Sequence, residues 1–368
     1  MAIDEINAAG GVEVDSSGHV QVDGVQMPTA GTLSNRNLVI NGGMAVWQRG
    51  TASAAVTNAF LADRFVTIEA TDGAITHEQS TDAPDGFAYS LKLSVTTADT
   101  SLAATQYAQL DHKIEAQNCQ GLKYGSSAAE TITLSFWVKS SKTGTYCIRL
   151  GKIDSTGYAY VKEYEINSAD TWEKKTITIE PDNSIKASAG AIANDNGEGL
   201  RITWPLAMGS TYSAATNGVW SSNLNDHTTS NAVNWLDNTS NNLYLTGVQL
   251  EVGEKATPFE HRSYGDELAS CMRYFHTANW QYCWLLNGVT YRAIAPGPSI
   301  PMRTTPDVSY FHPSTGTANQ ARQHSSGTAH TINDVGNASD AYGPSTYFGM
   351  SSTPTYPVTV KTQYDAEL

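Results

Sequence analysis

Apolar and polar residues alternate in many short stretches between residues 36 and 262, and this period of two is typical of half-buried β-strands. The clearest stretch contains Ile132, Leu134, Phe136 and Val138 on one face. Similar runs, separated by turn-forming residues, give about eight to ten strands, the number expected of a two-sheet sandwich or jelly roll. No repeat of about 20–50 residues is present, which argues against a propeller or a β-helix. We therefore predict a mostly β protein whose body, residues 36–262, is a jelly-roll β-sandwich.

The periodicity changes after this region. Residues 243–252 still alternate, but Leu268, Met272 and Phe275 follow the spacing of one helical face. The change predicts a short connecting helix over residues 263–276. We expect these three side chains to join protomers or domains.

Two smaller regions flank the sandwich and the helix. Residues 277–368 are rich in Pro, Ser, Thr and Tyr, and a β domain of this size with few aliphatic residues is marginal alone. Burial against copies of itself is the simplest remedy, so we expect an oligomer. Residues 1–35 predict an extended arm that orders by docking. Its only strand signal is a small hairpin built from four valines, Val12, Val14, Val20 and Val22.

The charge balance excludes some partners. The net charge of −14, with scattered acidic residues, argues against sequence-independent binding to nucleic acid. No apolar run reaches the roughly 20 residues of a membrane-spanning helix, so no membrane insertion is expected. The four cysteines have neither CxxC nor zinc-like spacing, and we expect them to be reduced and buried.

Catalysis and metal binding are not expected. No sequence spacing pairs the acidic candidates for glycosidic cleavage, which are Asp63, Asp195, Glu198, Glu251 and Glu260. Neither GxSxG nor HExxH occurs. The loop 195–198 offers oxygen ligands for calcium, but a plain turn is the preferred interpretation. His324 and His330 could form a ligand ring on a trimer axis, although exposed loop histidines are preferred. We therefore predict no cofactor.

Carbohydrate binding is the remaining site-level hypothesis. Aromatic faces stack on the C–H surfaces of sugar rings, while neighbouring Asn and Asp side chains bind the hydroxyls. This mixture occurs twice, once in the loop 208–242 and once near the C-terminus. The candidates are Trp220, Trp235, Asn223, Asp226, Tyr342, Tyr347 and Tyr356. The alternative is that these aromatics close the ends of the sandwich or pack at subunit contacts.

The chain resembles a family of tailed-bacteriophage fibre and virion appendage proteins. The resemblance covers most of residues 37–306. It rests on the segments NLVINGGMAVWQRGT (37–51), ADRF (62–65), LSFWVKSSKTGTY (134–146), YVKEYEINSADTWEKKTITI (160–179), LYLTGVQLEVGEKATPFEHRSYGDELASCMRYF (243–275) and PMRTTP (301–306). The resemblance implies a jelly roll like that of carbohydrate-binding modules, usually in a homotrimer built into the virion.

These expectations combine into a non-enzymatic virion protein, most simply a trimeric tail fibre that attaches to host-surface polysaccharide. Residues 1–35 would fix it to other virion proteins, and residues 277–368 would meet the host glycan. Several copies on one particle raise avidity by about 10²–10⁴ over single contacts. Two alternatives remain open: a capsid fibre, decoration or tail adaptor protein with no host ligand, and a polysaccharide depolymerase.

Overall fold

The computed structural model of this protein divides into two compact units, Met1–Ser263 and Tyr264–Leu368. The structure describes residues 12–14, 20–22, 25–26, 35–53, 58–283, 300–323, 326–336, 347–350 and 358–368.

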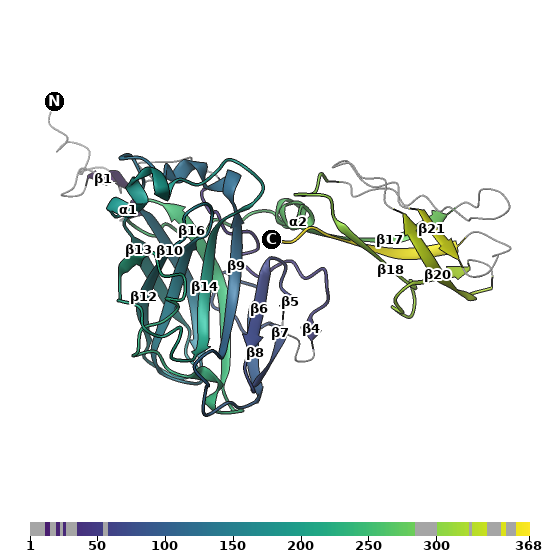
Figure 1. Ribbon diagram of the computed structural model, residues 1–368, viewed down its shortest axis with the longest axis horizontal. Coiled ribbons are helices and arrows are strands. Elements are labelled where there is room, and N and C mark those ends of the chain that lie inside the picture. The colour runs from purple at the N-terminus through teal and green to yellow at the C-terminus, as the bar shows by residue number, and fades with distance from the viewer. Residues whose placement is uncertain are drawn as a thin grey trace. The chain divides into compact units, whose positions relative to one another are not determined.

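The first unit is a sandwich of two antiparallel sheets (Figure 1). The six-stranded sheet has the order β13 (Glu173–Ile179), β10 (Ile132–Ser140), β16 (Asn242–Val252), β8 (Ser90–Thr97), β7 (Ala74–Ser80) and β4 (Ala52–Ser53). The seven-stranded sheet has the order β15 (Val219–Ser221), β12 (Tyr158–Ile166), β11 (Gly144–Lys152), β14 (Glu198–Met208), β9 (Tyr107–Glu115), β6 (Phe65–Ala70) and β5 (Ala59–Phe60).

Successive strands pass between these two sheets. Strands β8, β9, β10 and β11 belong alternately to the six-stranded and the seven-stranded sheet, as in a jelly roll. Short helical turns occupy some of the connections, namely η2 (Ala116–Leu122), α1 (Asn183–Lys186), η3 (Ser188–Gly190) and η4 (Trp235–Asp237). The prediction of a mostly β sandwich is confirmed.

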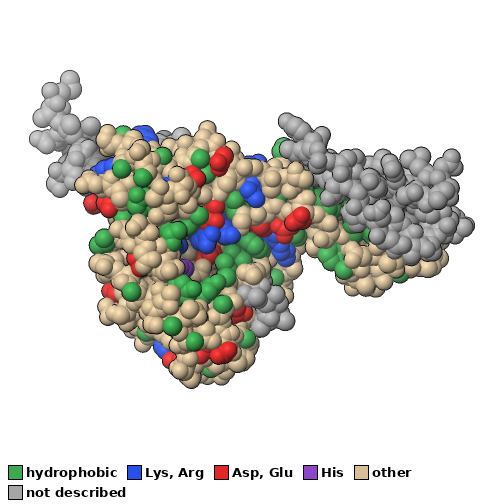
Figure 2. Space-filling model, viewed as in Figure 1, with side chains coloured by type: hydrophobic (Ala, Val, Ile, Leu, Met, Phe, Trp, Pro, Cys, Tyr) green, Lys and Arg blue, Asp and Glu red, His purple; other side chains and the backbone are tan. Residues whose placement is uncertain are grey.

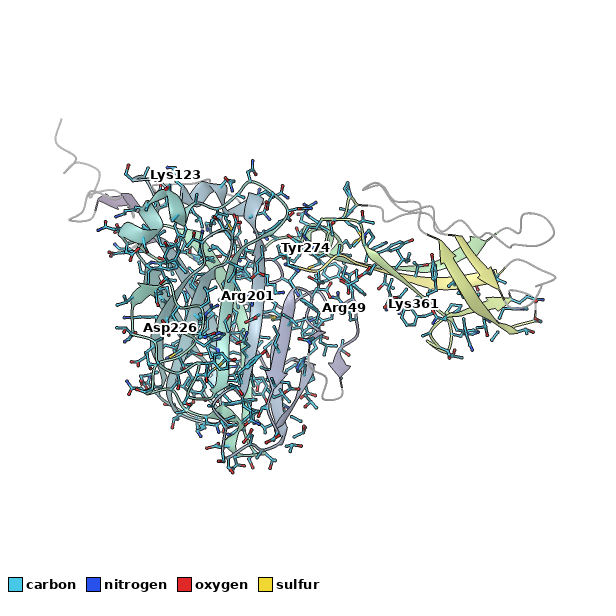
Figure 3. All side chains as sticks on the ribbon, in the orientation of Figure 1. Arg49, Lys123, Arg201, Asp226, Tyr274 and Lys361 are labelled. Atoms are coloured by element: carbon cyan, nitrogen blue, oxygen red, sulfur yellow. The ribbon has the colours of Figure 1, made fainter. Side chains whose placement is uncertain are left out.

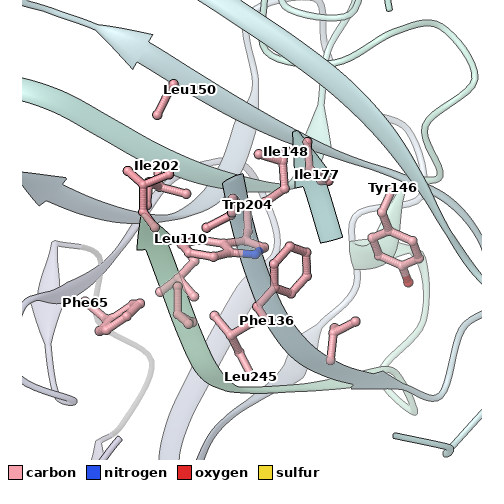
Figure 4. Packing of buried hydrophobic residues seen from close by; sticks show 14 of the residues in the cluster. Phe65, Leu110, Phe136, Tyr146, Ile148, Leu150, Ile177, Ile202, Trp204 and Leu245 are labelled. Atoms are coloured by element: carbon pink, nitrogen blue, oxygen red, sulfur yellow. The ribbon is translucent and has the colours of Figure 1, made fainter. Parts of the chain in front are cut away.

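Alternate residues of both sheets form the core of the sandwich. Trp204 of β14 is buried at its centre, with its ring centroid 5.8 Å from that of Phe136 in β10 and 6.2 Å from that of Phe65 in β6 (Figure 4). Aromatic rings at these separations and tilts pack favourably. Because the inward positions are used for this contact, the residues between them point to the outer faces.

Two asparagines in the segment before β4 replace missing backbone partners. Asn37 donates to the Val248 carbonyl and accepts the N–H groups of Val39 and Leu250. Asn41 donates to the carbonyls of Val46 and Asp63. Buried backbone groups need such partners, so this segment is fixed against the sandwich without forming a ladder.

The N-terminal residues that the structure describes form a small antiparallel sheet of β1 (Val12–Val14), β2 (Val20–Val22) and β3 (Val25–Gln26). Val12 pairs with Val22 and Val14 with Val20, so the predicted hairpin is present. The anchoring role of these valines stays a prediction.

The second unit begins with the helix α2 (Tyr264–Met272). Its sheet contains β17 (Phe275–Cys283), β18 (Asp307–Phe311), β19 (Gln320–Gln323), β20 (Ala329–Gly336), β21 (Tyr347–Met350) and β22 (Val358–Asp365). Its largest buried cluster comprises Tyr310, Ala321, Ile332, Val358 and Val360.

The predicted extent of the connecting helix is wrong at its C-terminal end. The helix ends at Met272, and Phe275 begins β17, where it pairs with Asp365 of β22. Aromatic and β-branched residues from position 274 onward favour a strand, and pairing with β22 overrides the helical spacing. Leu268 and Met272 do lie in the helix and are half-buried. Their role, with Phe275, in joining protomers or domains stays a prediction.

We expect Gly42→Ala to destabilise the sandwich by about 1–3 kcal/mol, because an added Cβ would lie 2.1 Å from the Val248 carbonyl oxygen. Urea unfolding would measure the loss. Gly43→Ala is the matched control, since its Cβ would meet nothing closer than 3.6 Å. Equal unfolding midpoints for the two variants would contradict the close approach.

Candidate functional site

The outer face of the seven-stranded sheet carries polar side chains on its central strands. In β9 the inward positions are apolar or buried, so Tyr107, Gln109, Asp111 and Lys113 lie on the outer face. The outward residues of β14 include Arg201 and Thr203, and β11 contributes Arg149. Charged and amide side chains therefore gather on the outer face of the seven-stranded sheet. Small polar residues would be enough for a face that only contacts solvent.

Strand register brings these residues together. Arg149 is the cross-strand partner of Thr203, which in turn is the partner of Asp111. Arg201 is the partner of Lys113 in the adjacent row. Directly opposed residues of antiparallel strands have Cβ atoms about 4.5–5.5 Å apart on the same face. The two rows thus form one polar cluster across β11, β14 and β9.

Specific contacts hold this cluster. Arg201 donates to both carboxylate oxygens of Glu198, at 2.6 and 2.8 Å, and its Nη1 lies 3.7 Å from Asp111 Oδ2. Gln109 Nε2 donates to the same Asp111 oxygen at 2.9 Å. Figure 3 labels Arg201 near the middle of the sheet, and Figure 2 shows basic, acidic and His side chains gathered there in a hollow.

Several buried polar atoms of this face lack hydrogen bonds within the described structure. They are Gln109 Oε1, His227 Nδ1 and Thr228 Oγ1. Asp111 is fully buried, and the hydroxyl of its cross-strand partner Thr203 acts on it as a hydrogen-bond donor that opposes the rise in the carboxyl pKa caused by burial. Buried polar atoms in native proteins almost always have a partner, so a group of unpaired polar atoms indicates water or a bound molecule with hydrogen-bonding groups.

The electrostatics of the cluster follow from burial. Burial raises the pKa of the Asp111 carboxyl, although Arg201 opposes the shift. Burial, together with repulsion from Arg201, lowers the pKa of Arg149 to about 10. Burial and the positive charges of Arg149 and Arg201 lower the pKa of His227 to about 3. Perturbed groups in a hollow mark candidate functional sites.

A segment of the loop 209–234 borders the cluster. Arg149 donates to the carbonyls of Asp226 and Leu224, at 3.0 and 3.1 Å. Tyr212 lies in the same loop, and its ring is 5.4 Å from the rings of both Tyr107 and His227. All three rings are half-buried. They form an aromatic row beside the polar cluster.

The structure separates the residues that the sequence had grouped as one loop site. Asn223 donates to Asp226 at 2.8 Å, and this pair lies beside Arg149 at the edge of the polar cluster. Trp220 instead lines a different cavity. Trp235 is 0% exposed in the sandwich core, so the prediction that it binds sugar is corrected: no face of its ring is available for stacking.

The C-terminal candidates remain predictions. Tyr342 and Tyr356 lie outside the described residues, as does His324. Tyr347 begins strand β21, and only its backbone is described. His330 is buried in β20 with Nε2 3.1 Å from Gln323 Oε1, and is therefore not an exposed loop histidine.

The acidic candidates have structural contacts. Asp63 accepts from the backbone and the side chain of Gln48. Glu251 accepts from Thr257, and Glu260 accepts from the backbone of Asn37. In the loop considered for calcium, Asp195 accepts the Gly197 N–H, while Glu198 pairs with Arg201. Within the described residues, no three His, Cys, Asp or Glu side chains lie close enough together to hold a metal ion.

The prediction about the cysteines can be checked at three positions. Cys119 and Cys147 are free and buried, as predicted, and Cys271 is buried as well. Among the described helices, none has the length and apolarity needed to cross a membrane.

The polar cluster itself was not predicted, although its signal is present in the sequence. The run from Tyr107 to Glu115 alternates an apolar or buried set with Tyr, Gln, Asp, Lys and Glu. Alternation alone does not distinguish a solvated face from a binding face. Only the register with β14 and β11 reveals the cluster.

The geometry defines a β-sandwich with a polar, aromatic-bordered outer face. Solved structures with similar folds include several carbohydrate-binding proteins. A xylan-binding domain from family 22 of the carbohydrate-binding modules matches over 56% of this chain and 99% of its own, with 12% identity and a TM-score of 0.28. The module TmCBM61, solved with β-1,4-galactotriose, matches over 60% and 100%, with 13% identity and a TM-score of 0.29.

A third similar structure is the enzymatically active domain of tailspike protein 4 from bacteriophage CBA120, with 11% identity and a TM-score of 0.29. The match covers 59% of this chain but only 22% of the tailspike chain. No protein-family model and no curated protein sequence matches this chain.

We expect the free energy of unfolding to fall as the pH drops below about 6.5, where unfolded histidines gain protons. Burial first, and nearby Arg side chains second, lower the pKa of His227 and His112 to about 3, so the folded state stays neutral there. The stabilisation that comes from keeping these two histidines neutral is therefore complete above pH ~6.5. It is lost as the pH falls towards the pKa of the histidines in the folded state. Urea unfolding across this range would show a shallower decline for His227→Asn, and identical slopes for variant and wild type would contradict the assignment.

Proposed function

We propose that this protein is a non-enzymatic structural protein of a bacteriophage particle, a tail fibre that attaches to polysaccharide on the host surface. The outer face of the seven-stranded sheet binds the sugar. The single observation that carries the binding role is the half-buried aromatic row Tyr107–Tyr212–His227 beside Arg201, whose side chain is one quarter exposed.

The chemistry of this face suits a polyhydroxylated ligand. Sugar hydroxyls donate hydrogen bonds to carboxylate and amide oxygens, and hydrogen bonds to a charged acceptor are stronger than neutral ones. Arg201 presents a guanidinium that is one quarter exposed to accepting ring or hydroxyl oxygens. The tyrosines provide faces for the C–H side of a ring. A site that combines these groups orients a sugar by its polar edge and holds it by its apolar face.

The local charge of the face also bears on the ligand. Arg149, Arg201 and Lys113 face Asp111, Glu198 and Asp226, so basic and acidic groups are equal in number on this face of a chain whose net charge is −14. An acidic sugar unit is therefore tolerated at this face, although the rest of the surface repels it.

The virion role rests on the resemblance of residues 37–306 to phage fibre and appendage proteins, and on no structural observation. In this role the N-terminal arm joins other virion proteins, and three copies act together. Individually weak sugar contacts then combine by avidity.

A polysaccharide depolymerase is the second candidate, because one observation favours it. Burial raises the pKa of the Asp111 carboxyl, and Asp111 shares the Arg201 guanidinium with Glu198, so two carboxyl groups lie on one face as in glycosidases. Release of reducing ends from host polysaccharide by the pure protein, lost in Asp111→Asn, would establish this function. Its absence would retire it.

We expect Tyr212→Ala to weaken binding to host polysaccharide by about two- to tenfold, the effect of losing one aromatic contact. Arg201→Gln should weaken it by about tenfold, because a charged and partly exposed donor is lost. Binding would be measured by biolayer interferometry on immobilised host polysaccharide.

Tyr264→Ala is the matched control, since this tyrosine is 60% exposed and belongs to the other unit. Urea unfolding of each variant would confirm that the sandwich is intact. Unchanged affinity in both folded outer-face variants would refute the assignment of the site.

The oligomer is tested separately. We expect light scattering to give the mass of three chains, because the small second unit gains buried surface from copies of itself. A mass near 39.5 kDa, that of one chain, would rule out the trimer.

A further inference from the structure

A small cavity lies between residues 205–208 of β14 and residues 228–234 of the loop that borders the polar cluster. The register of β11 with β14 ends at the pair Arg149 and Thr203. Beyond this pair the loop approaches β11 instead, because the Val233 N–H donates to the Thr145 carbonyl at 2.9 Å. The cavity therefore forms where the two central strands separate and the loop enters.

The cavity borders the aromatic row of the outer face. Met208, which lines the cavity, is the cross-strand partner of Tyr107, so both side chains lie on the same face of the sheet. Thr228 also lines the cavity and follows His227 in the chain. The N–H groups of His227 and Thr228 both donate to the Tyr212 carbonyl, at 3.1 and 3.0 Å. A sugar ring held by the aromatic row would thus have the cavity beside it.

The cavity is open to solvent and too small for a whole sugar unit. Ser230 in its lining is exposed, and Met208, Ser213, Ala232 and Val233 are half-buried. Its volume is about 180 Å³. Pockets that enclose a whole ligand measure about 300–1,000 Å³, and one water occupies about 30 Å³. The cavity therefore suits a substituent of a few heavy atoms.

The lining combines apolar side chains with hydroxyl groups. Pro205, Ala232 and Val233 are apolar, and none of the described residues that line the cavity is charged. Thr228 is 3% exposed, and its Oγ1 has no hydrogen-bond partner in the described structure. Its backbone is already used, since its N–H donates to Tyr212 and its carbonyl accepts from Ala215. A buried hydroxyl almost always has a partner, so this one indicates a molecule in the cavity that bonds to it.

We propose that the cavity receives the acetamido group of an N-acetylated sugar whose ring lies against Tyr212. This inference rests on the proposed sugar-binding role of the outer face and names the class of sugar that the face selects. The methyl of the acetamido group contacts Ala232 and Val233, and its carbonyl accepts from the Thr228 hydroxyl. An ammonium or carboxylate substituent would lose its hydration there without meeting an opposite charge.

The test measures a preference between matched sugars. The probes are the methyl glycosides of N-acetylglucosamine and N-acetylgalactosamine, compared with those of glucose, galactose and glucosamine, each titrated against the full chain by ligand-observed NMR. We expect at least one acetamido sugar to bind about tenfold more tightly than its parent sugar, and glucosamine to bind no better than glucose. Saturation transferred from the protein should be strongest on the acetyl methyl protons, because the cavity surrounds them.

Thr228→Val tests the hydrogen bond. It should lower the preference for the acetamido sugar by about two- to tenfold, the contribution of one hydroxyl donor. The urea midpoint should not fall, since the hydroxyl has no partner in the described structure. Thr216→Val is the matched control, because this exposed threonine belongs to the same loop and does not line the cavity.

Ala232→Leu tests the space. The longer side chain should fill the cavity and remove the preference for the acetamido sugar. Ala214→Leu is the matched control, since Ala214 is exposed and lies outside the cavity.

The outcomes separate this inference from the proposed function. Equal binding of acetamido and parent sugars would overturn the inference, as would a preference that Thr228→Val and Ala232→Leu both leave intact. Host polysaccharide that binds while no probe does would overturn it too. In each of these cases polysaccharide binding through Tyr212 and Arg201 stands. Host polysaccharide that does not bind at all would instead refute the proposed function, and this inference with it.

Discussion

The contact between the two sheets, centred on Trp204, is the interaction on which the rest of the structure depends. It fixes which residues of every strand point inward, because a shift of register by one would turn the apolar set outward. Once Leu110 and Ile114 of β9 are inside, Gln109 and Asp111 must be outside. The position of the binding face is thus a consequence of how the core is packed.

Burying charge on that face is costly, and the structure compensates only in part. Arg201 has Glu198 as a bidentate partner, and Arg149 has two loop carbonyls. Asp111 has the Gln109 amide and the Thr203 hydroxyl as donors, whereas Gln109 Oε1 has no partner in the described structure. A sheet whose only task was structural would gain stability from apolar or smaller residues at these positions. An unsatisfied polar cluster is explained more simply as part of a binding site than as part of a scaffold.

Much of the fold could be predicted from the sequence, whereas little of the site could. The alternating residues of β10 and β14 predicted the strands and their buried faces, because a period of two is a local property. The end of α2 was misjudged, since pairing of Phe275 with β22 is a long-range contact that helical spacing does not show. The loop with Trp220, Trp235, Asn223 and Asp226 has the composition of a sugar site, but composition does not show which rings face the core. The cluster on β9, β14 and β11 joins residues from positions 109 to 203, and only strand order brings them together.

A crystal structure with a fragment of the host polysaccharide would test the central claim most directly. The account predicts a sugar on the outer face of the seven-stranded sheet, with its ring against Tyr212 and an oxygen within hydrogen-bond distance of the Arg201 guanidinium. A sugar bound elsewhere, or none at all, would contradict it.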